Sequence, residues 1–143
     1  MLATLHLIIL VITLIGVVRA DHEGFAWIRG KKPILDFQKL RIYHYWVVKG
    51  LFGMIVTGLI LLWPMRDYLL TSSPLFILKM IFVALLVVNA FTIWELLKVA
   101  TVRTFASLSL KEKIPLFTSG LISTGCWMGA VVLGLYLFGL PSF

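Results

Sequence analysis

The sequence predicts an all-α integral membrane protein, an up-down bundle of four transmembrane helices with both termini on the external side. Four apolar stretches cover residues 2–18, 46–63, 75–97 and 114–138, and each is close to the roughly 20 residues that cross a bilayer as a helix. Hydrophobic residues make up 61% of the 143 residues, and charged residues only 13%. Because so few polar residues cannot cover a water-soluble globule, residues 1–143 are expected to form a single transmembrane domain.

Lysine and arginine are distributed unevenly between the polar segments. Six lie around the first connection and four around the third, whereas the second holds only Arg66. The positive-inside bias therefore places the first and third connections in the cytoplasm and both termini outside. The net charge of +7 follows from these segments and does not indicate nucleic-acid binding, because the positive residues are not gathered on one folded surface. The ten residues are Arg19, Arg29, Lys31, Lys32, Lys39, Arg41, Lys98, Arg103, Lys111 and Lys113.

Local signals place the ends of the helices. Residues 21–33 are expected to form a cytoplasmic loop that turns at a Gly-Lys-Lys-Pro run. Residues 34–41 alternate apolar and charged residues at helical spacing, so they are expected to continue into the second span as one helix. Residues 72–74, Ser-Ser-Pro, are typical of a helix N-terminus, and the fourth span is expected to start near Pro115. Short connections make consecutive spans antiparallel neighbours.

Small residues recur at helical spacing in two spans. In the second span, Gly50, Gly53 and Thr57 lie on one stripe, and in the fourth span Gly125 and Gly129 are four residues apart. Small side chains let helix backbones approach closely in membranes. We expect these residues to pack mainly within the bundle, with a homo-oligomer interface as the alternative.

The deepest ionisable or amide side chains of the apolar spans are those of His6, Lys79 and Asn89. His6 and Lys79 each lie about one turn inside the external end of a span, and Asn89 lies near the middle of the third span. An ionisable side chain at membrane depth costs about 2.5 kcal/mol or more, which makes it a candidate functional residue. Because His6 and Lys79 lie at matching depth, we expect them to share a site. Alternatively, Lys79 extends to the headgroups and His6 bonds only a carbonyl or a neighbouring helix.

Further polar residues lie near the cytoplasmic ends of the spans. His44 belongs to an aromatic belt at the interface, and pairing with His22 at the inner mouth is one way in which it would ligate a cofactor. His6 and His44 lie on the order of 20 Å apart along the membrane normal, so they would need a different helix register to ligate one haem within a protomer. Residues 21–23, Asp-His-Glu, form either a solvated loop or a weak cation site. The lone cysteine, Cys126, is expected to pack in the fourth span.

The segments around His6 and Lys79 resemble a known pattern. Leu5-His6-Leu7, together with Phe-Ile-Leu-Lys-Met at residues 76–80, is similar to small bacterial haem-associated membrane proteins, the CopD-like copper-resistance domain and the HemJ-like protoporphyrinogen oxidases. The resemblance covers the four spans by their arrangement. It implies a multi-pass protein of the bacterial cytoplasmic (inner) membrane that binds haem b, with His6 as the metal ligand. The chain departs from the pattern in the third span, where Asn89 or Thr92 replaces a histidine.

These features lead to two functional hypotheses. In the first, a b-type haem, a porphyrin or a quinone head is bound between the spans for a redox role. His6 is then the ligand or hydrogen-bond donor, and Lys79 pairs with a propionate or another anionic group. In the second, the chain is a non-enzymatic subunit of an oligomeric channel or transporter, or a membrane accessory protein. Further candidates for cofactor binding are His22, His44 and Asn89, with Met54 or Met128 as a second axial ligand.

The sequence lacks the signatures of several enzyme classes. It has no Cys-x-x-Cys pair, no haem-attachment motif, no nucleophile elbow and no phosphate-binding loop. The sequence leaves open whether the protein is an enzyme, and the partners it predicts are the lipid bilayer and a second copy of the chain.

Overall fold

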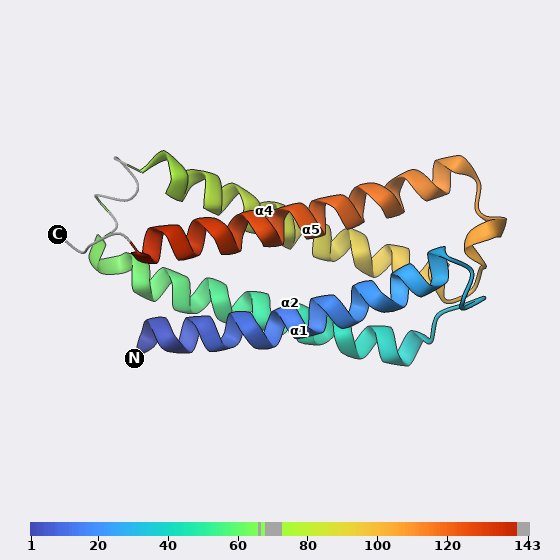
Figure 1. Cartoon of the computed structure of the whole chain (residues 1–143), viewed down its shortest axis with the longest axis horizontal. Helices are drawn as coiled ribbons and strands as arrows, with labels where there is room; N and C mark the ends of the chain where they lie inside the picture. Colours follow the sequence, from blue (N-terminus) through green and yellow to red (C-terminus); the bar gives the residue numbers. More distant parts are fainter. Residues whose placement is uncertain (66, 68–72, 140–143) are drawn as a thin grey trace.

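The computed structural model describes residues 1–65, 67 and 73–139, and that part of the chain is all-helical. Its four long helices are α1 (Leu2–Ile28), α2 (Phe37–Leu62), α4 (Pro74–Ala100) and α5 (Leu110–Gly139), with short 3-10 turns η1 (Trp63–Met65) and η2 (Phe105–Ser107) (Figure 1). Each long helix is long and apolar enough to cross a membrane. The expected all-α class and the four long apolar helices are confirmed. Arg66 and Ser72, used in the sequence argument, lie outside the described residues.

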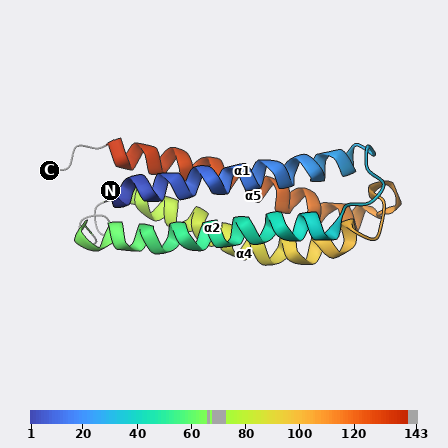
Figure 2. The same cartoon turned by 90° about the horizontal axis from the view of Figure 1, so that it is seen from below.

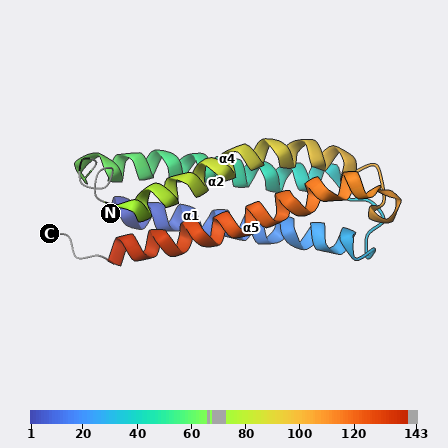
Figure 3. The same cartoon turned by 90° about the horizontal axis from the view of Figure 1, so that it is seen from above.

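The helices form two antiparallel hairpins. α1 packs along α2, α4 packs along α5, and α2 also contacts α4. Figures 2 and 3 show α2 and α4 along one side of the bundle and α1 and α5 along the other. We call the end that holds Leu2, Leu62 and Pro74 the terminal end, and the end that holds the α1–α2 and α4–α5 connections the loop end (Figure 1).

The first helix is longer than the sequence indicates. α1 continues to Ile28, so residues 21–28 are helical and the expected loop over this range is wrong. Two contacts hold the extension in place. Glu23 is 8% exposed and forms ion pairs with Lys32 and Lys39, and Trp27 is only 2% exposed. These contacts depend on residues beyond the helix, so the local pattern did not reveal them.

The end of α1 confirms the expected turn. Gly30 has a φ of 71°, which is a conformation that glycine adopts without a steric penalty. The Gly30 N–H donates to the Trp27 carbonyl at 3.0 Å, and the Lys31 N–H donates to the Ala26 carbonyl at 2.9 Å. This pair of bonds is a Schellman motif, which satisfies carbonyls at the end of a helix.

The starts of the other helices follow from capping residues. Asp36 caps α2, which then runs without a break from Phe37 to Leu62. The expected continuity with the second span is confirmed, but residues 34–36 precede the helix, so its expected start at residue 34 is wrong. Ser73 caps α4 and Pro74 occupies its first turn, also as expected.

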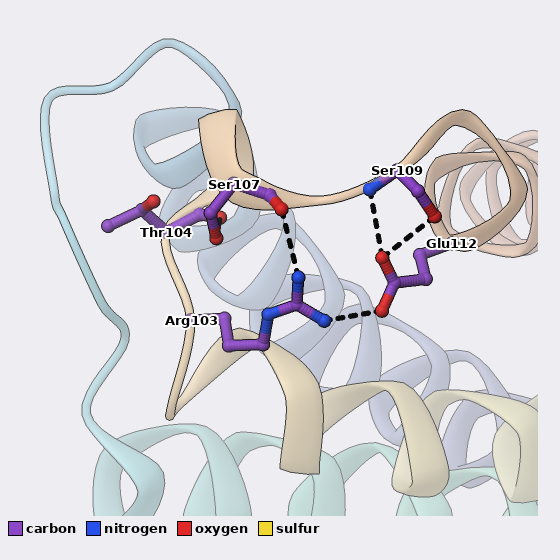
Figure 4. Close-up of polar contacts among 5 residues, drawn as sticks. All are labelled: Arg103, Thr104, Ser107, Ser109 and Glu112. Atoms are coloured by element: carbon purple, nitrogen blue, oxygen red, sulfur yellow. Dashed lines mark hydrogen bonds and ion pairs between the residues drawn. The ribbon is translucent and has the colours of Figure 1, made fainter.

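α5 begins one turn before the expected position near Pro115, because Glu112 accepts hydrogen bonds from the Ser109 N–H and hydroxyl, both at 2.8 Å (Figure 4). The pattern Ser-x-x-Glu at residues 109–112 is a capping box, which the sequence interpretation missed.

The glycine stripes pack closely at two of the four predicted glycines. A Cβ added to Gly50 would lie 1.9 Å from Thr13 Oγ1, and one added to Gly129 would lie 2.3 Å from Phe82 Cε2. A Cβ at Gly53 would meet Ile9 at an ordinary 3.5 Å. Gly125 has no neighbour within 4 Å of such an atom, so the prediction of close packing there is wrong. Gly125 faces outward, on a side of α5 that α4 does not cover.

The loop end joins the two hairpins. Trp27 Nε1 donates to the Arg103 carbonyl at 3.1 Å, and the Leu35 N–H donates to the Ala100 carbonyl at 3.0 Å. The Trp27 ring also meets Phe105 edge-on, with 5.3 Å between centroids. Trp27, Leu35, Leu40, Ala100 and Leu108 form a small buried core there. A second core, of Val17, Leu51, Leu86, Cys126 and Trp127, lies further toward the terminal end, and it includes the cysteine that was expected to pack.

The orientation in the membrane stays a prediction that can be tested directly. We expect the terminal end to be external, because ten lysines and arginines lie around the two connections of the loop end and one lies between α2 and α4. Alkaline phosphatase fused after residue 143 should be active, and green fluorescent protein fused there should be dark. Fluorescence without phosphatase activity would show the opposite orientation.

Candidate functional site

A cavity of about 320 Å³ lies between the two hairpins, on the terminal side of the bundle. All four long helices line it, and nearly all of the lining side chains are apolar. Leu51, Leu86 and Trp127 belong both to the lining and to the buried core, so the core forms the floor of the cavity. The two ionisable side chains in the lining are His6 and Lys79. The sequence-based expectation placed these two in one site.

His6 is held by a hydrogen bond to the neighbouring helix. Its Nδ1 lies 2.7 Å from Thr57 Oγ1. The Thr57 hydroxyl donates its one hydrogen to the Gly53 carbonyl at 2.8 Å, so it accepts from His6. In a neutral imidazole this arrangement puts the proton on Nδ1 and leaves Nε2 with its lone pair free. Nε2 has no hydrogen-bond partner among the described residues, so it can accept a hydrogen bond or ligate a metal.

Glycine makes room for the His6 ring on α2. A Cβ placed on Gly58 would lie 3.6 Å from His6 Cε1. A larger side chain at that position would press on the ring. The neighbouring pair Thr57 and Gly58 therefore sets the ring position, one residue by a hydrogen bond and the other by its lack of a side chain.

Lys79 points into the bundle. Its Nζ would lie 3.3 Å from a Cβ placed on Gly134 of α5, a residue about 7 Å inside the end of that helix. The ammonium group therefore stays within the bundle, which argues against the alternative that Lys79 extends to the headgroups. Within the described chain it has no hydrogen-bond or ion-pair partner. A cation in an apolar lining favours binding of an anionic group, because an unpaired charge is costly there.

Two methionines also line the cavity. Met54 comes from α2 and Met80 from α4, so each offers a thioether sulfur on a wall of the cavity. Met128, the other methionine considered from the sequence, is 64% exposed and lies outside the cavity lining. If a metal needs a second ligand in this cavity, Met54 and Met80 are the side chains placed to supply it.

The remaining predicted site residues lie elsewhere. Asn89 exchanges hydrogen bonds with Ser119 of α5, donating to its carbonyl at 3.0 Å and accepting from its hydroxyl at 2.8 Å. Asn89 is therefore an interhelical tie whose side chain is already occupied. His44 stacks on Trp94 near the loop end, with ring centroids 5.5 Å apart, and His22 is exposed on α1. The structure does not bring His22, His44 or Asn89 into the cavity.

The Asp-His-Glu run at residues 21–23 does not gather as a cation site. Its three residues lie on the helix α1, and Glu23 is engaged by Lys32 and by Lys39, whose Nζ is 2.6 Å away. In the part of the chain that the structure describes, no group of three or more His, Cys, Asp or Glu side chains is placed to hold a metal ion.

Sequence reasoning missed Thr57, Gly58 and Gly134 as parts of the site. Thr57 was assigned to helix packing alone. A depth comparison contains the missing signal: Thr57 lies about one and a half turns before the end of α2, and His6 about one turn after the start of the antiparallel α1. Polar residues at matching depth on neighbouring spans are expected to meet, as His6 and Thr57 do.

Comparison of the chain with protein-family models, with curated proteins and with solved structures gives no match.

Proposed function

We propose that this chain is a small multi-pass membrane protein that binds a b-type haem in the cavity between its hairpins, for a redox role. The observation that carries the proposal is the pairing of two groups in one apolar cavity: a histidine with a free Nε2 and a lysine without a counterion. The lone pair of Nε2 suits iron, and the ammonium group suits a propionate. The proposal places the protein in the bacterial cytoplasmic membrane, as the family resemblance of His6 and Lys79 implies.

His6 and Lys79 together fit a haem better than they fit a quinone. A ligating histidine typically donates its other ring N–H to a nearby acceptor, and Thr57 is that acceptor for His6. A quinone has no anionic group for Lys79. A metal-free porphyrin would satisfy Lys79 through its carboxylates but would leave Nε2 without a metal. Haem, when bound, would supply one-electron chemistry. The protein's own residues would hold it, with His6 as a ligand of the iron and with Met54 and Met80 as the lining residues that carry a thioether.

The size of the cavity is consistent with a ligand that also reaches the lipid. About 320 Å³ is near the lower end of the roughly 300–1,000 Å³ typical of ligand sites. Lining residues at its edge face outward, since Leu59 is 52% and Leu135 is 54% exposed. The cavity therefore opens between helices, and an apolar edge of a macrocycle can extend there among lipid chains.

The absorption spectrum of the purified protein tests the proposal. Protein produced with adequate haem supply should be red in detergent, with a Soret band and sharp bands on reduction. Colourless protein should take up added haemin in a saturable titration. A preparation that shows no chromophore and no uptake would overturn the proposal. Uptake of a metal-free porphyrin with affinity equal to that of haemin would remove His6 as a ligand.

A second function is favoured by one observation. Gly120 and Gly125 of α5 are both open, with nothing within 4 Å of a Cβ at either position. Small residues on a lipid-facing helix surface favour association with another helix. A homo-oligomeric channel or transporter subunit, or an accessory protein, is therefore the alternative. A colourless extract with a defined oligomer of high mass would support it.

A further inference from the structure

A second hollow lies at the loop end, remote from the cavity that holds His6. Its volume is about 420 Å³, and it lies between the α1–α2 connection and the α4–α5 connection. Trp27, Arg29 and Lys32 line it from the end of α1 and the α1–α2 connection, and Thr104 and Phe105 line it from the α4–α5 connection. The polar contacts that fold the α4–α5 connection, from Arg103 to Ser107 and Glu112, are shown in Figure 4. The hollow is therefore formed by both hairpins.

The charges around this hollow are mainly positive. Glu23 is the carboxylate that faces Lys32, and it is offset by both Lys32 and Lys39. Arg29 is exposed, and no described residue accepts a hydrogen bond or forms an ion pair with its guanidinium group. Lys113 Nζ lies 4.9 Å from the centroid of the Phe105 ring, beside the lining. Two cations, Arg29 and Lys113, thus remain without a carboxylate partner at an aromatic surface.

The depth of the hollow in the membrane follows from the length of α1. Its 27 residues span about 40 Å, whereas the hydrocarbon core of a bilayer is about 30 Å thick. If Leu2 lies near one boundary of the core, the other boundary lies near residue 21, and Arg29 lies about 10 Å further out. That is the depth of the lipid headgroups.

We propose that this hollow binds the phosphate group of an anionic phospholipid, with Arg29 as its main contact. A guanidinium group can donate two parallel hydrogen bonds to phosphate oxygens, and basic pockets at the cytoplasmic side of helix bundles bind anionic headgroups. Phe105 and the apolar part of the hollow then lie beside the glycerol and upper acyl chains. A bound lipid contacts both connections, so it stabilises the joined hairpins.

The test compares lipids on variants of the full chain in detergent. Added phosphatidylglycerol should raise the unfolding temperature of the wild type, whereas phosphatidylcholine should not, and native mass spectrometry should retain one phosphatidylglycerol on the protein. Arg29→Gln should abolish the shift and reduce lipid retention at least tenfold. Arg19→Gln, an exposed arginine on α1 outside the hollow, is the matched control and should behave as the wild type.

Other outcomes would overturn the assignment. An equal loss of lipid retention in Arg29→Gln and Arg19→Gln would show that the lipid is attracted to the basic loop end in general and does not bind at a specific site. Full retention of phosphatidylglycerol by Arg29→Gln would show that Arg29 is not the lipid contact. A full shift with inorganic phosphate alone would assign the hollow to a soluble phosphate compound. Arg29→Lys keeps the charge but not the bidentate geometry, so unchanged retention in this variant would contradict the proposed contact. None of these results depends on haem binding in the other cavity.

Discussion

Gly50→Leu should destabilise the protein more than any other single glycine replacement in the helices. Even the first added carbon would lie 1.9 Å from Thr13 Oγ1 and 2.8 Å from Thr13 Cβ. Thr13 is β-branched and 2% exposed, and its hydroxyl bonds the Ile9 carbonyl at 2.6 Å, so it cannot move aside. α1 and α2 must therefore separate. Overpacking typically costs about 1–3 kcal/mol, and we expect a loss at or above the upper end of this range.

Thermal unfolding in detergent measures this effect, and Gly125 supplies the matched control. Gly125 has nothing within 4 Å of an added Cβ, and alanine is favoured over glycine in a helix by about 1 kcal/mol. Gly125→Ala should therefore raise the unfolding temperature slightly, whereas Gly50→Ala should lower it. If Gly50→Leu unfolds at the same temperature as the wild type, the close approach of α1 and α2 is wrong. If Gly125→Leu changes only the oligomeric state, the open surface of α5 at Gly125 binds a second copy.

His6→Ala should abolish the chromophore, or weaken haemin binding by more than about tenfold, a difference of about 1.4 kcal/mol. The physical reason is the loss of Nε2, the free ligand atom in the cavity. His44→Ala is the matched control, because His44 stacks on Trp94 outside the cavity. It should keep the wild-type spectrum. The reverse result, in which His44→Ala loses the chromophore and His6→Ala keeps it, would show that the haem ligand is His44 at the loop end.

Substitutions of Thr57 and Lys79 test two different roles in the same site, support of the His6 ring and pairing with a propionate. Thr57→Val keeps the shape but leaves His6 Nδ1 without its acceptor, and loss of such an outer partner typically costs 10–100-fold in metal affinity. Thr57→Ser should restore binding. Lys79→Met should weaken haemin binding while leaving the uptake of a haem analogue esterified at its propionates unchanged, since the ester carries no charge to pair. If all of these variants bind haemin as the wild type does, the cavity is not the site.

The four spans could be predicted because periodicity and length are local properties of the sequence. Ser73 and Pro74 marked the start of α4 for the same reason. The ends at the loop side could not be placed as well. α1 continues to Ile28 because Glu23 meets lysines that follow in the chain and because Trp27 is covered by the other hairpin. These are tertiary contacts, and an apolar-polar pattern cannot show them. Ser109 and Glu112 were a readable cap that was overlooked.

The part of the candidate site that could be predicted is the part that depends only on how deep a residue lies in its span. His6 and Lys79 lie at matching depth from the terminal end of the bundle, and the cavity includes both. The rotation of each helix about its own axis, which decides the residues that face a neighbouring helix, was not predictable. Asn89 is turned toward Ser119, Met128 is turned outward, and Gly125 faces away from α4 although Gly129 one turn later contacts Phe82. A helix that is apolar on all sides contains no sequence signal for which side is covered.

The division into two hairpins has a consequence for biosynthesis. Each hairpin contains its own glycine contact, Gly50 against Thr13 in one and Gly129 against Phe82 in the other. The first hairpin is complete once α2 has left the ribosome, so it can insert and close before α4 exists. A gene cut between the codons of η1 and α4 should therefore yield two co-produced fragments that reassemble in the membrane through Trp27, Leu35 and their partners at the loop end.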